Sequence, residues 1–228
     1  MKMRNKIFII LITVIILIFF SLISCGKQIN TTTTTKIADV ATTIQATTTT
    51  VKETTTTKAA GLLEPSLKGK IITPSVTAAE IKLIDHNGQP FQLSSFRGKV
   101  VLVFFGFSHC VDECPETMAI ISQALETVGD TSKDVEVVMV STDLANDTPE
   151  SMKEFMGKFN PAFLGLLGTS DELAKAWHDY GVTVLDGGET HSSFTYVVDK
   201  KGMLRETFLR NLTPDDVAAD LKALLAEK

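Results

Sequence analysis

The chain has 228 residues, with 27 acidic and 22 basic side chains and a formal net charge of −5. Its first residues carry Lys2, Arg4 and Lys6, so cleavage after residue 24 would take the charge from −5 to −8. An acidic chain of this kind offers no basic surface to a phosphate backbone, which argues against nucleic acid as a partner.

Residues 1–24 are typical of a signal peptide of the lipoprotein type. Basic residues precede an apolar run from Ile7 to Phe20, and small residues come before Cys25. The run is short for a membrane span, which needs about 20 residues. Leu22 to Cys25 resembles a lipobox, so we expect cleavage before Cys25 and lipidation of its thiol; an uncleaved anchor helix is the alternative. Both predict a membrane-anchored, extracytoplasmic protein, on the periplasmic or cell-surface side.

Residues 25–60 are predicted to be a disordered, Thr-rich tether. Threonine dominates residues 31–57, which contain no aromatic residue and no periodic apolar pattern. Such a segment cannot bury enough apolar surface to offset the entropy lost on ordering. Residues 61–228 are then left to form one globular domain.

The first half of this domain predicts alternating strands and helices. Asn87-Gly88 is a turn signal between short extended runs, which predicts a hairpin. The run KVVLVFFGF is apolar throughout and rich in β-branched and aromatic residues, which is typical of a strand buried on both faces. In chain order we expect a strand over 99–107, a helix over 114–128 and a second buried strand over 135–141.

The second half adds two helices, a hairpin and a last helix. We expect a helix over 149–159 capped by Thr148, a short strand over 163–167 and a helix over 171–179 capped by Ser170. Strands over 194–198 and 204–208 should form the hairpin, and Thr213 should cap the final helix. This order predicts an α/β sandwich of the thioredoxin-like type.

Cys110 and Cys114 are the residues most clearly marked for chemistry. Lipidation of Cys25 would leave them as one close pair, and a disulfide closing so small a loop adds little stability. They follow a buried strand and begin a helix, whose free N–H groups and positive dipole end favour thiolates. If the segment is helical, residues four apart share a face. Thiolates bind soft ions such as Cu(I), or Zn(II), and also exchange with disulfides, so metal binding and redox chemistry both remain open.

Four histidines are candidates for a further ligand. His191 follows a Gly-containing loop and precedes a predicted strand, from where it can reach a neighbouring site. His109 adjoins Cys110, but adjacent side chains usually diverge. We expect His86 to be a solvated turn residue and His178 to be a surface or packing residue of a helix.

Three ordered motifs resemble those of the Sco/SenC copper proteins: FFGFSHCVDECP, VVMVSTDLANDTPE and THSSFTYVVDKKG. The resemblance covers residues 78–226. It implies a thioredoxin-like sandwich with an added β-hairpin. It also implies copper, as Cu(I) or Cu(II), bound by Cys110, Cys114 and His191.

The resemblance leaves several neighbouring residues open. Asp143 matches an acidic position near the site, where it either orients a ligand or handles protons, or else caps a turn. Val111 and Thr190 depart from the family, which often has proline and aspartate at these positions. Met118 lies one helical turn after Cys114, and we expect it to pack in the core rather than to bind copper.

The resemblance also implies two functions. The first is a copper chaperone that delivers copper to the cytochrome c oxidase subunit carrying the binuclear copper site, or reduces the thiols of that site. The alternative is a thiol–disulfide oxidoreductase that uses Cys110 and Cys114 as a redox dithiol. A chaperone turns over no substrate, so the sequence leaves enzymatic activity undecided. Other copper or thiol proteins are further candidate partners.

Overall fold

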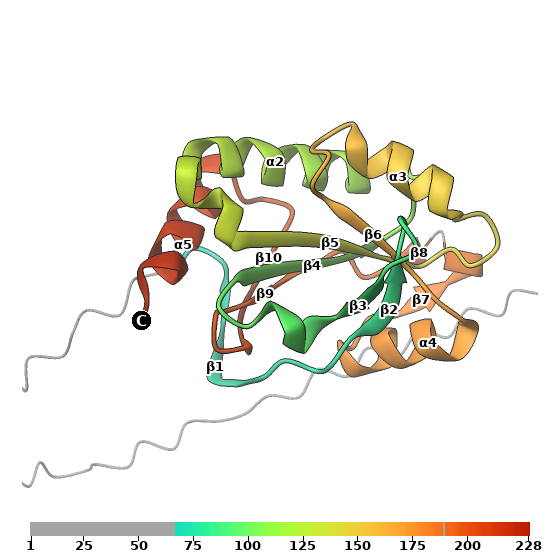
Figure 1. The fold of residues 1–228 in the computed structure, drawn as a ribbon, viewed down its shortest axis with the longest axis horizontal. Helices are drawn as coiled ribbons and strands as arrows, with labels where there is room; N and C mark the ends of the chain where they lie inside the picture. The colour runs from blue at the N-terminus through green and yellow to red at the C-terminus, as the bar shows by residue number, and fades with distance from the viewer. Residues whose placement is uncertain (1–66, 189) are drawn as a thin grey trace, which may run out of the picture. The chain divides into compact units, whose positions relative to one another are not determined.

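The structure is a computed structural model that describes residues 67–188 and 190–228 (Figure 1). The predicted signal peptide, the tether and Cys25 lie outside the described residues. Within the described part of the chain, no helix is both long and apolar enough to cross a membrane.

Eight strands of the described chain form one mixed sheet, in the order β1-β10-β9-β4-β5-β6-β2-β3. Strands β4, β5 and β6 run parallel to one another, and every other neighbouring pair is antiparallel. The strands are β1 (Lys70–Thr77), β2 (Lys82–Asp85), β3 (Pro90–Gln92), β4 (Val100–Gly106), β5 (Val135–Ser141), β6 (Leu164–Leu167), β9 (Thr195–Val198) and β10 (Met203–Phe208).

Helices cover both faces of this sheet, so that the domain has three layers (Figure 1). The helices are α2 (Glu113–Val128), α3 (Pro149–Gly157), α4 (Ser170–Asp179) and α5 (Pro214–Ala226). Helices α2, α3 and α5 pack in one core cluster and α4 in the other. Short 3-10 turns η1 (Leu93–Phe96), η2 (Gly129–Asp134) and η3 (Asp186–Gly188) join some of these elements.

The central strand β4 confirms the prediction of a strand buried on both faces. All seven of its residues are buried. Successive side chains of a strand point to opposite faces. Leu102 and Phe104 accordingly pack toward α2, α3 and α5, whereas Val103 and Phe105 pack toward α4. A strand with apolar residues at every position can occupy only such a central place.

The helix caps explain why most helices begin where the sequence predicts. Thr148 and Thr213 cap their helices as predicted, and the structure shows that each does so within a capping box. The predicted cap of α4 is wrong by one residue: Thr169, not Ser170, is the N-cap. The Thr169 hydroxyl accepts a hydrogen bond from the N–H of Glu172, and the Glu172 carboxylate accepts from the N–H of Thr169. This reciprocal pair satisfies two helix-end donors together, which a cap at Ser170 would not do.

Strand β1 and the surroundings of His86 also differ from the expectations. Strand β1 has no counterpart in the sequence prediction, because it is an edge strand whose side chains are mostly exposed and whose pairing with β10 is distant in sequence. The sequence predicts His86 in a solvated turn, but the residue is only 8% exposed. Its Nδ1 accepts a hydrogen bond from the Gly165 N–H at 3.0 Å. The turn folds against β6, which buries the imidazole.

Candidate metal centre

Sheet topology brings the predicted ligands to one end of the central strands. Cys110 and Cys114 follow the carboxyl end of β4, where sites of α/β sheets are commonly built. Strand β9 runs antiparallel to β4, and Thr195 at its start pairs with Phe104 near the end of β4. His191 lies just before β9, so the same pairing brings it beside residues 107–112, which connect β4 to α2 and which we call the cysteine loop.

Cys110 lies in the loop before α2, and Cys114 lies in the first turn of that helix. The two cysteines therefore do not share a helix face, as they would if the whole segment were helical. The Cys110 sulfur accepts a hydrogen bond from the Cys114 N–H at 3.4 Å. Asp112, the N-cap residue, makes no side-chain cap bond. The Cys110 sulfur thus satisfies one of the free N–H groups at the start of α2.

Cys114 is fully buried, and this burial reverses the expected effect of the helix end on its thiol. Burial raises the pKa of the Cys114 thiol, whereas the backbone of Phe107 lowers it by a hydrogen bond and Cys110 raises it further. A methyl group at Gly106 would lie 2.9 Å from the Cys114 sulfur. The absence of a side chain at Gly106 therefore makes room for this thiol at the end of β4.

Two phenylalanines hold the His191 ring. Its centroid lies 6.2 Å from the Phe104 ring and 5.8 Å from the Phe107 ring, both in edge-to-face geometry. Its Nδ1 lies 3.3 Å from the carbonyl oxygen of Ser192. If Nδ1 carries the proton and donates to that carbonyl, Nε2 is left as the nitrogen available to a metal.

His191 belongs to a small hairpin outside the main sheet. Strand β7 (Val184–Leu185) pairs antiparallel with β8 (Thr190–His191). The hairpin is fastened to the end of β5, where the Thr142 hydroxyl donates to the Gly188 carbonyl at 3.1 Å. Gly188 has a φ of 113°, and a Cβ there would lie 2.1 Å from the Thr142 carbonyl oxygen. Only glycine permits so close an approach of the hairpin to the strand.

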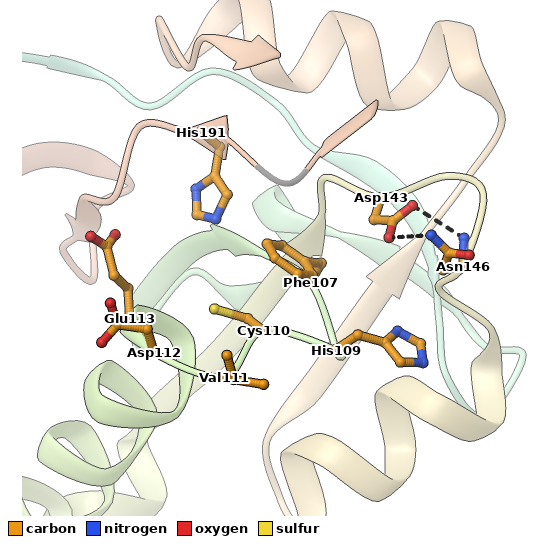
Figure 2. A pocket seen from close by; sticks show the side chains of 9 residues that line it. All are labelled: Phe107, His109, Cys110, Val111, Asp112, Glu113, Asp143, Asn146 and His191. Atoms are coloured by element: carbon orange, nitrogen blue, oxygen red, sulfur yellow. Dashed lines mark hydrogen bonds between the residues drawn. The ribbon is translucent and has the colours of Figure 1, made fainter. Parts of the chain in front are cut away.

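An open pocket of about 710 Å³ joins these residues. In Figure 2 the Cys110 side chain lies beneath the His191 ring on one side of the pocket, and the His109 ring points away from the Cys110 sulfur. The wall also includes three acidic residues, of which Asp112 and Glu113 are paired with Arg210 and Asp143 accepts hydrogen bonds from its own turn. The wall consists of Phe107, His109, Cys110, Val111, Asp112, Glu113, Asp143, Asn146 and His191.

Asp143 caps a turn at the end of β5. One carboxylate oxygen accepts from the N–H groups of Ala145 and Asn146, both at 3.1 Å, and the other accepts from the Asn146 side chain at 2.8 Å. The structure thus shows Asp143 capping a turn, and its role toward a ligand stays a prediction. Its position in the pocket wall still leaves it near the predicted ligands.

A second buried carboxylate, missed by the sequence analysis, fixes the cysteine loop. Asp147 accepts hydrogen bonds from the Ser108 N–H at 2.9 Å, the Ser108 hydroxyl at 2.7 Å and the Ser141 hydroxyl. Ser108 also lies 3.0 Å from Nδ1 of His109. This network turns His109 away from Cys110, as expected for adjacent side chains.

The remaining candidates behave largely as expected. Met118 is fully buried in the core cluster with α5, which confirms core packing. His178 is exposed on α4. In residues 67–188 and 190–228, no three His, Cys, Asp or Glu side chains are grouped closely enough to hold a metal ion. Cys110 and His191 share the pocket, whereas Cys114 lies behind its wall.

Comparison with known proteins identifies the family. The SCO1/SenC family model matches residues 70–226. The chain is 35% identical over 147 residues to "Protein sco1" of Schizosaccharomyces pombe, covering 60% of this chain and 56% of that protein. It spans about half the length of the first two curated relatives, 46% and 56%.

Solved structures confirm the thioredoxin-like fold. ScoI of Bradyrhizobium japonicum, solved with copper bound, is 33% identical with a TM-score of 0.60, over 65% of this chain and 99% of that one. Apo Sco1 of Thermus thermophilus is 32% identical with a TM-score of 0.63, over 71% and 99% of the two chains. With its motifs, its sheet and its cysteine–histidine pocket, the chain belongs to the SCO1/SenC family.

Proposed function

We propose that this chain is a membrane-tethered, extracytoplasmic copper chaperone. The observation that carries the proposal is the shared pocket of Cys110 and His191, with Cys114 bonded through its N–H to the Cys110 sulfur. Two thiols and an imidazole suit copper in both oxidation states, because thiolates favour Cu(I) and imidazole also suits Cu(II). Membership of the SCO1/SenC family and the copper-bound relative support copper over zinc.

The donor set fits copper in its chemistry, and its three members differ in their access to the pocket. The Cys114 side chain is fully buried and its thiol lies within hydrogen-bond reach of Cys110, so it is the least accessible of the three donors at the pocket. Cys110 and His191 are already accessible there. We infer that copper, the cargo of the protein, first meets these two residues and that Cys114 completes the site.

An open pocket also suits release of the cargo. Copper held at its wall can be passed on by exchanging ligands one at a time with the thiols of a partner. We propose that this partner is the cytochrome c oxidase subunit that carries the binuclear copper site, as the family resemblance implies. Other copper or thiol proteins are further candidates.

The thiol–disulfide oxidoreductase remains a second candidate, favoured by two free cysteines of unequal exposure. In this reaction the Cys110 thiolate attacks a partner disulfide, and one partner thiolate leaves. Cys114 then attacks the Cys110 sulfur of the mixed disulfide and releases the second partner thiolate. The partner gains two electrons, and Cys110 and Cys114 end as a disulfide. Reduction of oxidase thiols would be this same chemistry.

We further propose that residues 1–60, which lie outside the described residues, tether the protein to the membrane. The supporting observation is the basic, apolar and small-residue pattern before Cys25. Mass spectrometry of the mature N-terminus should find acylated Cys25. Detection of an intact Met1 would instead indicate an uncleaved anchor helix and contradict the lipid anchor.

The His191→Ala variant tests the chaperone proposal. We expect it to fold and to keep a reducible dithiol, but to bind Cu(II) at least about tenfold more weakly, because the imidazole donor is lost. Chelator competition measures the affinity, and the sulfur-to-copper absorption band reports the site. His178→Ala, which removes an exposed helix imidazole, is the matched control. Unchanged Cu(II) affinity in His191→Ala would remove His191 from the ligand set.

A further inference from the structure

A hydrogen-bonded clamp joins the start of α2 to residues 192–194, which follow His191 and which we call the histidine loop. The Glu113 carboxylate accepts a hydrogen bond from the Ser193 hydroxyl through one oxygen and from the Arg210 guanidinium through the other. Glu113 precedes Cys114 in the chain, and Ser193 lies two residues after His191. Arg210 comes from the connection between β10 and α5. We call Glu113, Ser193 and Arg210 the clamp.

Arg210 fixes the clamp to the start of α2. It also contacts Glu116 at 3.1 Å and Asp112 at 3.8 Å, so three carboxylates of one helix start converge on its guanidinium. Exposed ion pairs of this kind add little stability individually. Their effect here is geometric, because they hold the Glu113 side chain in the direction of Ser193.

The histidine loop depends on such a contact because its backbone has few sheet bonds at this point. Residues 192–194 lie between β8 and β9 and belong to neither strand. Ser192 is tied to Thr183, with its N–H donating at 3.1 Å and its hydroxyl accepting at 3.2 Å. The Ser193 bond to Glu113 ties this loop to the start of α2, in addition to the edge contacts of His191 with Phe104 and Phe107.

We propose that Glu113, held by Arg210, is a positioning residue that fixes the His191 loop against Cys110 and Cys114 and so controls Cu(II) binding. The inference rests on the proposed ligand set. Cu(I) is held well by two soft thiolates, whereas Cu(II) has more to gain from the imidazole. Loosening the histidine loop should therefore weaken Cu(II) binding far more than Cu(I) binding, whereas general misfolding would weaken both.

The test uses Ser193→Ala in the purified full chain, with Ser193→Thr as the conservative rescue. We expect Ser193→Ala to bind Cu(II) about tenfold more weakly, as is typical when a residue that orients a metal ligand is lost. Its Cu(I) affinity, measured anaerobically by chelator competition, should stay within about twofold. Ser193→Thr keeps the hydroxyl and should recover most of the Cu(II) affinity.

Glu116→Gln is the matched control, because it removes another carboxylate from Arg210 and leaves the Glu113–Ser193 bond intact. It should bind both copper ions as the wild type does. Hydrogen exchange of the copper-free chain gives a second measurement: amides of residues 191–194 should exchange faster in Ser193→Ala than in Glu116→Gln.

The outcomes separate this inference from the proposed function. If His191→Ala loses Cu(II) while Ser193→Ala keeps it, the ligand set stands and the clamp has no positioning role. Equal losses of Cu(I) and Cu(II) in Ser193→Ala would also overturn the role, because they indicate general disruption. If His191→Ala binds Cu(II) normally, the ligand set fails and the positioning role fails with it.

Discussion

At the scale of single residues, the two thiols have different surroundings although they lie four positions apart. Cys110 is half-buried at the pocket wall, and Cys114 is fully buried among core side chains. Reaction with a reagent in solution requires both access and a thiolate. Cys114 lacks both in this structure, so under the proposed function an incoming copper ion or partner disulfide would meet Cys110 first.

Alkylation of the native reduced chain should reveal this difference. We expect iodoacetamide to modify Cys110 about tenfold or more faster than Cys114, because burial shields the Cys114 sulfur and raises its pKa. Peptide mass spectrometry after a short pulse measures both sites. In denaturant the two rates should converge. Equal labelling of the native chain would show that Cys114 reaches solvent as readily as Cys110.

At the scale of elements, local signals and distant pairings differ in how well sequence predicts them. The strands over 100–106 and 135–141 are predictable because central strands read as continuous apolar runs. Caps such as Thr148 are predictable because their partners lie three residues away. Strand β1 is not, because its pairing with β10 joins residues more than 100 positions apart.

The candidate site shows the same division. Cys110 and Cys114 stand out in the sequence through their spacing and their place after β4, whereas His191 needed the family resemblance. The clamp gives no sequence signal, because 80 and 97 positions separate Glu113 from Ser193 and Arg210. The edge contacts of Phe104 and Phe107 with His191 likewise depend on how β9 docks against β4.

The corrected cap of α4 can be tested with a pair of neighbouring substitutions. Thr169→Ala should lower the free energy of unfolding by about 1 kcal/mol, because the helix loses its N-cap acceptor. Ser170→Ala places alanine at the first helical position and should change it by less than about 0.5 kcal/mol. Urea denaturation measures both variants. A larger loss in Ser170→Ala would restore Ser170 as the cap.

At the scale of the whole molecule, a buried carboxyl pair joins the start of the described chain to its last helix. Asp220 of α5 accepts hydrogen bonds from the N–H groups of Lys68 and Gly69, at 2.7 to 2.9 Å. Glu206 of β10 lies beside it, with both carboxylate oxygens buried and without a hydrogen-bond partner among the described residues. Burial and the charge of Asp220 raise the pKa of Glu206 to about 8.

This pair predicts stability that depends on pH. The folded pKa of Glu206 lies above its ordinary value of 4.5, so folding favours the protonated form, which can donate to Asp220. The stabilisation is fully present below pH 4.5 and is lost as pH rises through about 8. Each unit of pKa shift corresponds to about 1.4 kcal/mol, so the loss is measurable.

The Glu206→Gln side chain resembles the protonated carboxyl group in shape but does not titrate. We expect it to lose less stability than the wild type between pH 5 and 9, as measured by urea denaturation at each pH. Glu136→Gln, which alters a carboxylate paired with Lys99 near the surface, serves as the control and should follow the wild type. Parallel pH profiles for Glu206→Gln and the wild type would contradict the assigned protonation.

The antiparallel docking of β9 on β4 also makes the site depend on parts of the chain that are distant in sequence. The cysteine loop and α2 are local structure, whereas His191 reaches them only after a pairing between residues about 90 positions apart, which is slow to close. A chain caught before that step presents two thiols and no nearby imidazole. Under the proposed ligand set such a chain would hold Cu(I) better than Cu(II), so the preference between the two oxidation states would report whether β9 is docked on β4.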